Sequence, residues 1–217
     1  MFYNNHPTFV ATRSCRVSRL QPTIRNVNYV SAGDKFKVDI AANVMRHGGV
    51  IAYPTEAVWG LGCDPFNRDA VLRLLRLKSR VPSKGLILVA GNVLQVSMLL
   101  ATLPAAVREA INESWPGPVT WLLPEAGLVP DWITGEHQTV AVRVSAHPLV
   151  VALCESFGGP IVSTSANPSG RAPARNELRV RQYFGRKLDF VLPGRTGGSI
   201  SPSSIRDAIT GAILRPA

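Results

Sequence analysis

The sequence predicts an α/β protein in which helices pack on a sheet. Short apolar runs with the length of buried strands alternate with segments whose apolar residues recur at helical spacing, and glycine or proline separates them. A chain of 217 residues suits one domain, or one domain with an extension. Its 46% apolar and 18% charged residues are typical of a globular protein rather than a disordered one.

The first ordered elements are a helix and a buried strand. From Lys37 to Met45 the apolar residues recur at helical spacing, and Gly48-Gly49 supplies the stop. The run from Val50 to Tyr53 is short, apolar and typical of a buried strand.

Polar side chains follow this strand. Pro54 lacks a backbone donor and fixes φ, which predicts that the strand stops or leaves the ladder there. Thr55 and Glu56 then stand where a strand end faces a cleft, and Gly60 and Gly62 predict a compact turn.

The same signals place the remaining elements. We predict further helices at residues 71–77, 93–101, 104–114, 148–157 and 177–184. We predict further strands at residues 86–90, 119–123, 139–144, 161–167 (where the strand runs into a loop), 190–192 and 213–214. Polar and cationic residues gather where these strands end, and ligands of open α/β sheets tend to bind at such crevices.

The charge balance is the strongest global clue to function. Twenty-four Lys and Arg against fourteen Asp and Glu give a formal charge of +10 and a pI near 10.3. Such a protein attracts polyanions, either nucleic acid or a phosphate-rich small substrate. The alternative is a basic solvated surface with no specific partner.

Residues 1–33 differ from the rest of the chain. They contain Arg13, Arg16, Arg19 and Arg25 and no acidic residue. Without an apolar core segment they are not a secretory signal, and their amphipathic pattern is weak for an organellar transit peptide. We expect a flexible basic arm or a start codon placed too far upstream, and the sequence does not separate these two from a targeting segment.

The cysteines and the hydropathy point to a cytoplasmic protein. Cys15, Cys63 and Cys154 lie far apart and form no CxxC pair, which argues against a zinc site or a disulfide framework and fits a reducing cytoplasm. No apolar run approaches the roughly 20 residues that span a bilayer, so we expect no membrane partner.

One candidate cluster is cationic. Lys78 and Arg80 are two residues apart in what we predict to be an extended loop, so their side chains point the same way and could grip a polyphosphate together, with Lys84 close by. The competing interpretation is a solvated basic loop. Arg143 and Arg195 form a further candidate pair of cations.

A second cluster is neutral and polar. The strand period of two places Ser163, Ser165 and Asn167 on one side, at the end of a buried strand. Three such groups suit a carboxylate, carbamate or phosphate oxygen, although they could equally be satisfied turn hydroxyls.

Several common catalytic arrangements are absent from the sequence. It has no GxxxxGK[ST], no G-x-S-x-G and no HExxH, and acidic residues are sparse in the loops. We therefore predict no P-loop, no hydrolase triad and no protein-bound metal site. The polar residues suit anion binding and charge stabilisation better than proton transfer.

Together the motifs resemble the YrdC-like threonylcarbamoyl-AMP synthases, in their short single-domain bacterial form. The resemblance covers residues 38–217, leaves residues 1–33 outside, and rests on six motifs in family order: Tyr-Pro-Thr-Glu-Ala-Val-Trp-Gly-Leu-Gly (53–62), Lys-Ser-Arg (78–80), Trp-Pro-Gly-Pro-Val-Thr (115–120), Ala-Val-Arg-Val (141–144), Ser-Thr-Ser-Ala-Asn (163–167) and Pro-Ser-Ser-Ile-Arg-Asp (202–207).

The resemblance implies a twisted open mixed sheet with a basic substrate cleft. It implies a nucleotidyltransferase that condenses L-threonine, bicarbonate and ATP into threonylcarbamoyl-AMP and pyrophosphate. The product would supply the threonylcarbamoyl group of adenosine 37 in tRNA, through downstream threonylcarbamoyl transferases. Mg²⁺ would arrive mainly with ATP.

The resemblance also implies roles for individual residues. The catalytic set would be Lys78, Arg80, Ser165 and Asn167. Threonine and its carbamate would contact Thr55, Arg143 and Ser163. ATP would contact Arg80, Lys84, Thr120, Ser165, Arg195 and Ser203.

The chain departs from the family pattern beside the cationic cluster. Relatives often have proline directly after the arginine, where this chain has Val81, and asparagine where it has Lys84.

Two other functions are weighed. One is a double-stranded RNA or tRNA-binding module, supported by the basic residues between Arg171 and Lys187. The other is the carbamoyl-transfer domain of hydrogenase maturation proteins, for which the chain lacks the length and the cysteines.

Overall fold

The computed structural model describes residues 30–125 and 127–216. Residues 1–29, which include Cys15 and most of the predicted extension, lie outside the described residues. None of the described helices is long and apolar enough to cross a membrane.

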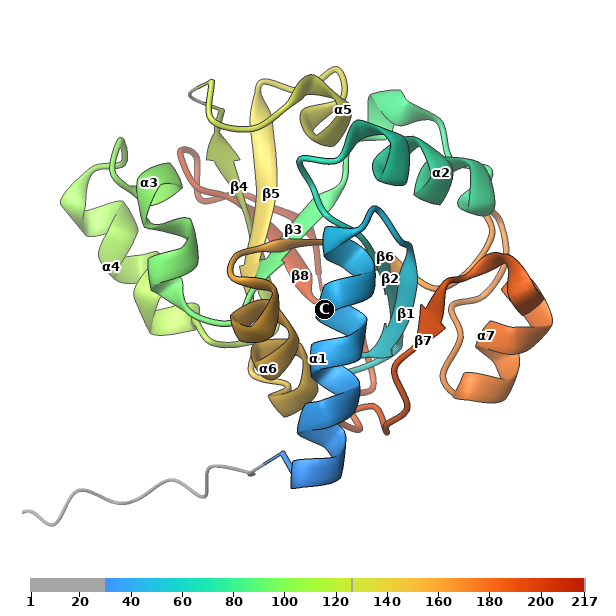
Figure 1. Cartoon of the computed structure of the whole chain (residues 1–217). Coiled ribbons are helices and arrows are strands. Elements are labelled where there is room, and N and C mark those ends of the chain that lie inside the picture. The colour runs from blue at the N-terminus through green and yellow to red at the C-terminus, as the bar shows by residue number, and fades with distance from the viewer. Residues whose placement is uncertain (1–29, 126, 217) are drawn as a thin grey trace, which may run out of the picture.

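A nine-stranded sheet forms the centre of the molecule (Figure 1). Its strand order is β7-β1-β2-β6-β3-β5-β4-β8-β9. Strands β1 and β7, β3 and β5, and β4 and β8 pair in parallel, and the other neighbours pair antiparallel, so the sheet is mixed as predicted. The strands are β1 Ile51–Pro54, β2 Trp59–Gly62, β3 Ile87–Ala90, β4 Val119–Pro124, β5 Thr139–Val144, β6 Ile161–Ser165, β7 Phe190–Val191, β8 Ser204–Asp207 and β9 Ile213–Arg215.

Seven α-helices and three short 3₁₀ segments surround the described part of the sheet. The helices are α1 Ala32–Arg46, α2 Arg68–Lys78, α3 Ser97–Leu100, α4 Ala105–Ser114, α5 Asp131–Thr134, α6 Pro148–Phe157 and α7 Glu177–Phe184. The 3₁₀ segments are η1 Pro82–Lys84, η2 Val93–Val96 and η3 Gly185–Lys187.

The two faces of the sheet are covered unequally. Helices α1 and α6 lie side by side on one face, where they bury Val89 and Ile161 of the central strands (Figure 1). Helices α2, α3, α4 and α7 supply buried side chains to the core on the opposite face, around Leu88 and Val142. Successive strand residues point to opposite faces, so β3 contributes to both cores, Leu88 to one and Val89 to the other, whereas the buried valines of β5 all belong to the core on the α2 face.

Most predicted elements are confirmed, with shifted ends. The first helix begins at Ala32 rather than Lys37, because the Ser31 side chain accepts a hydrogen bond from the Asp34 backbone N–H and caps the helix there. The prediction for residues 93–101 is wrong in detail, since η2 and the short α3 replace a single helix.

Two strands lie where the sequence pattern predicts none. The stretch from Trp59 to Gly62 forms strand β2 instead of a compact turn, and Pro54 still faces Trp59 at the end of that ladder. Gly60 and Gly62 serve close packing, because a Cβ on Gly62 would lie 2.7 Å from the Val162 carbonyl oxygen. The second such strand, β8, carries Ser204 to Asp207 beside β4.

Candidate active site

A cavity of about 480 Å³ lies on the face of the sheet that α1 and α6 cover only in part. Side chains two residues apart along a strand point to the same face of the sheet, and this places the cavity on the face that α1 and α6 cover. Val89 and Ile161 pack under α1 and α6, whereas Ile87 and Ser163, two residues away along the same strands, line the cavity. The predicted strand-end crevice is therefore only partly right, since the floor extends along the strands as well as beyond their ends.

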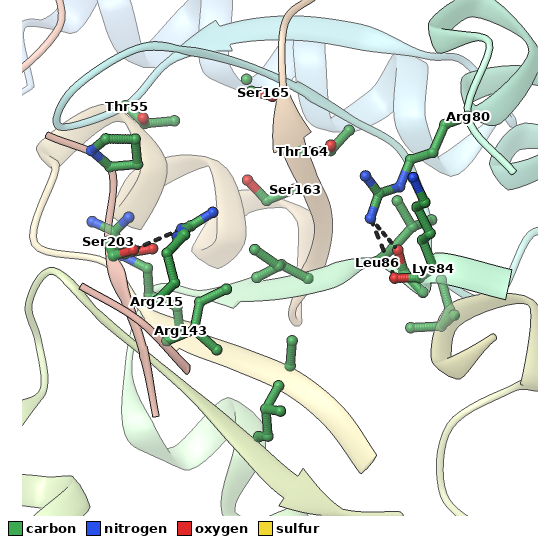
Figure 2. Close-up of a pocket in the computed structure, with 18 of the residues that line it drawn as sticks. Thr55, Arg80, Lys84, Leu86, Arg143, Ser163, Thr164, Ser165, Ser203 and Arg215 are labelled. Atoms are coloured by element: carbon green, nitrogen blue, oxygen red, sulfur yellow. Dashed lines mark hydrogen bonds between the residues drawn. The ribbon is translucent and has the colours of Figure 1, made fainter. Parts of the chain in front are cut away.

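Cationic side chains dominate the charge of this cavity. Arg80, Lys84, Arg143 and Arg215 line it, and no described Asp or Glu does. Figure 2 shows Arg80 and Lys84 at one end, Arg143 and Arg215 at the other, and hydroxyl groups between them. Two separated cationic ends joined by neutral donors suit a ligand, or a pair of ligands, with negative charge at both ends.

Arg80 is held against the turn that carries Lys84. Its Nη2 donates to the carbonyl oxygens of Gly85 at 2.9 Å and Lys84 at 3.2 Å. Its Nε is buried and donates to no described residue. Partial burial lowers the pKa of the guanidinium, which nonetheless stays charged at neutral pH.

Lys78 does not lie in an extended loop, and this part of the prediction is wrong. It is the last residue of α2, and Ser79 takes a left-handed conformation that turns the chain before Arg80. The buried Lys78 ammonium donates to the backbone oxygens of Ser165 and Asn167, at 2.8 Å for the latter, and is not among the residues that line the cavity. Burial, with a smaller effect from the charge of Arg80, lowers the pKa of Lys78 to about 8.

Arg143 and Glu56 form a buried ion pair at the opposite end. Arg143 Nη2 lies 2.6 Å from Glu56 Oε1, and Arg143 Nε donates to the Gly117 oxygen at 3.1 Å. Burial raises the pKa of Glu56, but Arg143 and the hydrogen bonds from Ser145 and the Ala146 N–H outweigh it, so the pKa lies below its usual value. The carboxylate is therefore ionised at neutral pH.

Four predicted hydroxyl residues lie in the cavity walls. Ser163, Ser165 and Thr55 line the cavity, and the Thr55 hydroxyl donates to the Val58 oxygen at 2.7 Å within its turn. Ser203 also lines it, and its hydroxyl lies 2.9 Å from that of Thr120. Thr120 is fully buried and faces a smaller recess that shares Ser163 and Ser203 with the main cavity.

Two predicted site residues lie outside the lining. The Asn167 side-chain nitrogen donates to the Arg171 oxygen at 2.7 Å, which folds its own loop, while its buried Oδ1 accepts no hydrogen bond from a described residue. Arg195 is exposed, and its backbone oxygen lies 3.0 Å from His147 Nε2. Arg195 and Arg143 thus do not form a pair of cations within the cavity.

Sequence reasoning missed Arg215. It belongs to β9, whose pairing with β8 places it opposite Ile205, and its Nη2 donates to the Ser203 oxygen at 2.6 Å. The alternation of side chains between the two faces of β8 and β9 could have indicated Arg215, but only if β8 had been recognised as a strand. His137 also lines the cavity.

Residues 43–217 match the model of the Sua5/YciO/YrdC family, described as "Telomere recombination". The chain belongs to this family. The YrdC-like assignment made from the motifs is thereby confirmed, and the family region contains all the cavity-lining residues named above.

The YrdC-family chain is similar to curated bacterial enzymes along nearly their whole length. It is 57% identical to the threonylcarbamoyl-AMP synthase of Pseudomonas aeruginosa (strain UCBPP-PA14) over 182 residues, which are 84% of this chain and 98% of that protein. It is 55% identical to the Cellvibrio japonicus enzyme of the same name, over 83% of this chain and 95% of that protein.

Solved structures share the fold of this YrdC-family chain. Sua5 from P. abyssi in complex with L-threonine matches with a TM-score of 0.79 and 33% identity, over 84% of this chain and 54% of that longer protein. YciO from E. coli matches with a TM-score of 0.74 and 23% identity, over 83% of this chain and 89% of that chain, and supports the fold alone.

Proposed function

We propose that this chain condenses L-threonine, bicarbonate and ATP into threonylcarbamoyl-AMP and pyrophosphate, the step that supplies the threonylcarbamoyl group for modification of tRNA. Curated relatives at 55–57% identity and near-full coverage carry this activity in their names. The observation that supports it best in the structure is the cavity, with four cationic side chains, several hydroxyls and no carboxylate in its described lining.

The chemistry of the reaction fits such a cavity. The amine of threonine and bicarbonate first give an N-carboxylate with loss of water. A negative oxygen of this carboxylate then attacks the α-phosphorus of ATP and displaces pyrophosphate. The attacking group already carries charge, so the protein needs no strong general base. It must instead hold two anions together and neutralise the charge that develops on the pyrophosphate.

The phosphates belong, in this proposal, to the end that carries Arg80 and Lys84. A planar guanidinium and a compact ammonium on neighbouring segments can bind a polyphosphate from two sides. Ser165, on the wall between the two ends, would contact the α-phosphate. Mg²⁺ would enter with ATP and be held by its phosphates, since the described lining offers no carboxylate.

Threonine and its carbamate would occupy the end that carries Arg143. Arg143 would bind the amino-acid carboxylate, and Thr55 and Ser163 would contact the remaining polar groups. The structural similarity to a Sua5 solved with L-threonine supports a threonine site in this fold. Arg215, Ser203 and Thr120 would close the cavity around the nucleotide.

Lys78 and Asn167 have indirect roles in this proposal. Lys78 joins the end of α2 to the Ser165–Asn167 segment, and Asn167 folds the loop that follows. They would position Ser165 and Arg80 rather than line the cavity. Arg195, exposed and outside the lining, is assigned no contact with ATP.

The test is replacement of Arg80 by alanine. Because the phosphate end would lose one of its two cations, we expect pyrophosphate release to fall at least about 100-fold, with thermal unfolding near that of the wild type. Arg108→Ala, an exposed change on α4, is the matched control and should stay near wild-type activity. Near-normal turnover of Arg80→Ala would contradict the assignment.

RNA binding remains a proposed accompanying property. Six exposed basic residues supply the charge, namely Arg171, Arg175, Arg179, Arg181, Arg186 and Lys187. Binding would be to backbone and shape and would weaken steeply with salt. If the affinity for tRNA at about 150 mM salt is no better than that of an unrelated basic protein, RNA binding is excluded as a property of this chain.

A further inference from the structure

We propose that Glu56 is a positioning residue for the substrate: its carboxylate fixes the Arg143 guanidinium so that one edge of it faces the threonine carboxylate. The inference rests on the proposed function, which assigns Arg143 to threonine but gives Glu56 no role. Glu56 is absent from the lining of the main cavity and lines the smaller recess beside it.

Two anchors hold the Arg143 side chain. Nε donates to the Gly117 oxygen at 3.1 Å, and Nη2 lies 2.6 Å from Glu56 Oε1. Nη1 makes no hydrogen bond or ion pair with any described residue, and Arg143 lines the cavity. A guanidinium has a rigid planar fork, so fixing Nε and Nη2 fixes the direction of Nη1 as well.

Glu56 is itself held firmly. Its Oε1 accepts hydrogen bonds from the Ser145 hydroxyl at 2.7 Å and from the Ala146 N–H at 3.1 Å, both just beyond the end of β5. Its backbone oxygen accepts from the Ser199 N–H at 2.9 Å. The carboxylate therefore connects the turn after β1 to the strand that carries Arg143, and its side chain is only 15% exposed.

The pair also sets the charge at this end of the cavity. An ionised Glu56 cancels the charge of Arg143, whereas Arg80, Lys84 and Arg215 have no carboxylate beside them in the described lining. Threonine carries both an ammonium and a carboxylate, so a neutral pair suits it better than an isolated cation. At the other end, the unpaired Arg80 and Lys84 remain for the phosphates.

The opposite idea is that Glu56 competes with the substrate for Arg143. Competition would require the ligand to displace Glu56 from Nη2, although Nη1 is available and the carboxylate has two further hydrogen bonds to keep it in place. Positioning and competition predict opposite changes in threonine affinity, so one variant separates them.

The experiment measures pyrophosphate release by wild type and Glu56→Gln, with threonine and ATP varied in turn at saturating bicarbonate. The glutamine side chain keeps the shape but removes the charge that orients Arg143. We expect the KM for threonine to rise about tenfold or more, with the KM for ATP within about twofold of wild type. Glu177→Gln, which breaks an exposed ion pair with Arg181 on α7, should change neither.

Direct binding of L-threonine by calorimetry supplies a readout that does not depend on turnover. An unchanged or lower threonine KM in Glu56→Gln, with wild type active, overturns the positioning role and leaves the proposed function intact. If the wild type releases pyrophosphate without threonine and without bicarbonate, both the proposed function and the positioning role of Glu56 are overturned. If Glu56→Gln does not fold, Ser145→Ala replaces it, and unchanged threonine affinity in that variant overturns the inference.

Discussion

At the scale of single residues, buried charge in and beside the cavity distinguishes it from an ordinary basic surface. Glu56, Arg143 and Lys78 are each at least largely buried and each bonded to a defined partner. Burial of a charge is costly unless it is paired, so such groups persist where their geometry is needed. The pairing of Glu56 with Arg143 could not be predicted from sequence, because 87 residues separate them and only the folded sheet brings them together.

The first prediction concerns acid stability. The pKa of Glu56 is lower in the folded chain than its ordinary value of 4.5, so the unfolded chain binds this proton more readily. Glu56 therefore contributes stability that is present above pH 4.5 and lost as the pH falls through the folded-state pKa.

At pH 7 we expect Glu56→Gln to unfold at a lower urea concentration than wild type. At about pH 3 we expect the difference between the two proteins in the free energy of unfolding to be smaller. Urea unfolding followed by circular dichroism at both pH values measures it. A difference that stays constant with pH would mean that the Glu56 charge contributes nothing to stability.

The second prediction concerns Arg215, the cation that the sequence did not indicate. Arg215→Ala removes a guanidinium from the cavity wall and frees the Ser203 oxygen. We expect the KM for ATP to rise about tenfold, because a hydrogen bond to a charged group contributes about 1.5–3 kcal/mol. Arg108→Ala again serves as the control, and equal KM values for ATP in the two variants would exclude a nucleotide role for Arg215.

At the scale of elements, the sequence predicts strands and helices well where the apolar pattern is strong. Strands β3, β4, β5 and β6 and helices α2, α6 and α7 lie where the pattern places them. It fails at β2, where two glycines suggest a turn although they permit close packing against Tyr53 and Val162. It also fails at Lys78, because an ordinary helix C-terminus with a left-handed Ser79 looks like an extended loop in sequence.

The third prediction tests the packing of β2. A Cβ on Gly62 would lie 2.7 Å from the Val162 carbonyl oxygen and 2.8 Å from Tyr53 Cε1, closer than real contacts allow. We expect Gly62→Ala to lower the free energy of unfolding by about 1–3 kcal/mol. Gly159→Ala, where nothing lies within 4 Å of the new Cβ, is the matched control. Similar urea midpoints for both variants would contradict the packing argument.

At the scale of the whole molecule, the charge of +10 and the cavity act together. The overall charge attracts polyanions at long range, and the cavity collects four cationic side chains at short range. Composition alone predicts an anionic partner, but not which one. The order of six motifs along the chain indicates the family. Residues from five of these motifs line the cavity and Thr120 of the remaining motif lines the recess beside it, which explains why the motifs are dispersed in sequence.

The fourth prediction follows from this charge distribution. ATP is a polyanion and threonine a zwitterion, so salt should weaken ATP binding far more than threonine binding. Between about 50 and 500 mM KCl, where the screening length falls severalfold, we expect the dissociation constant of ATP to rise at least about tenfold and that of threonine to change less than about threefold. Calorimetric titration measures both, and equal salt slopes would argue against a cationic phosphate end.

The central claim is that this cavity joins threonine, bicarbonate and ATP. The most direct measurement is mass spectrometry of the protein incubated with all three substrates, beside reactions that omit one of them and a reaction with Arg80→Ala. We predict a mass of threonylcarbamoyl-adenylate, with pyrophosphate, in the complete wild-type reaction only. ATP binding without that product, or a product that forms equally well with Arg80→Ala, would contradict the account.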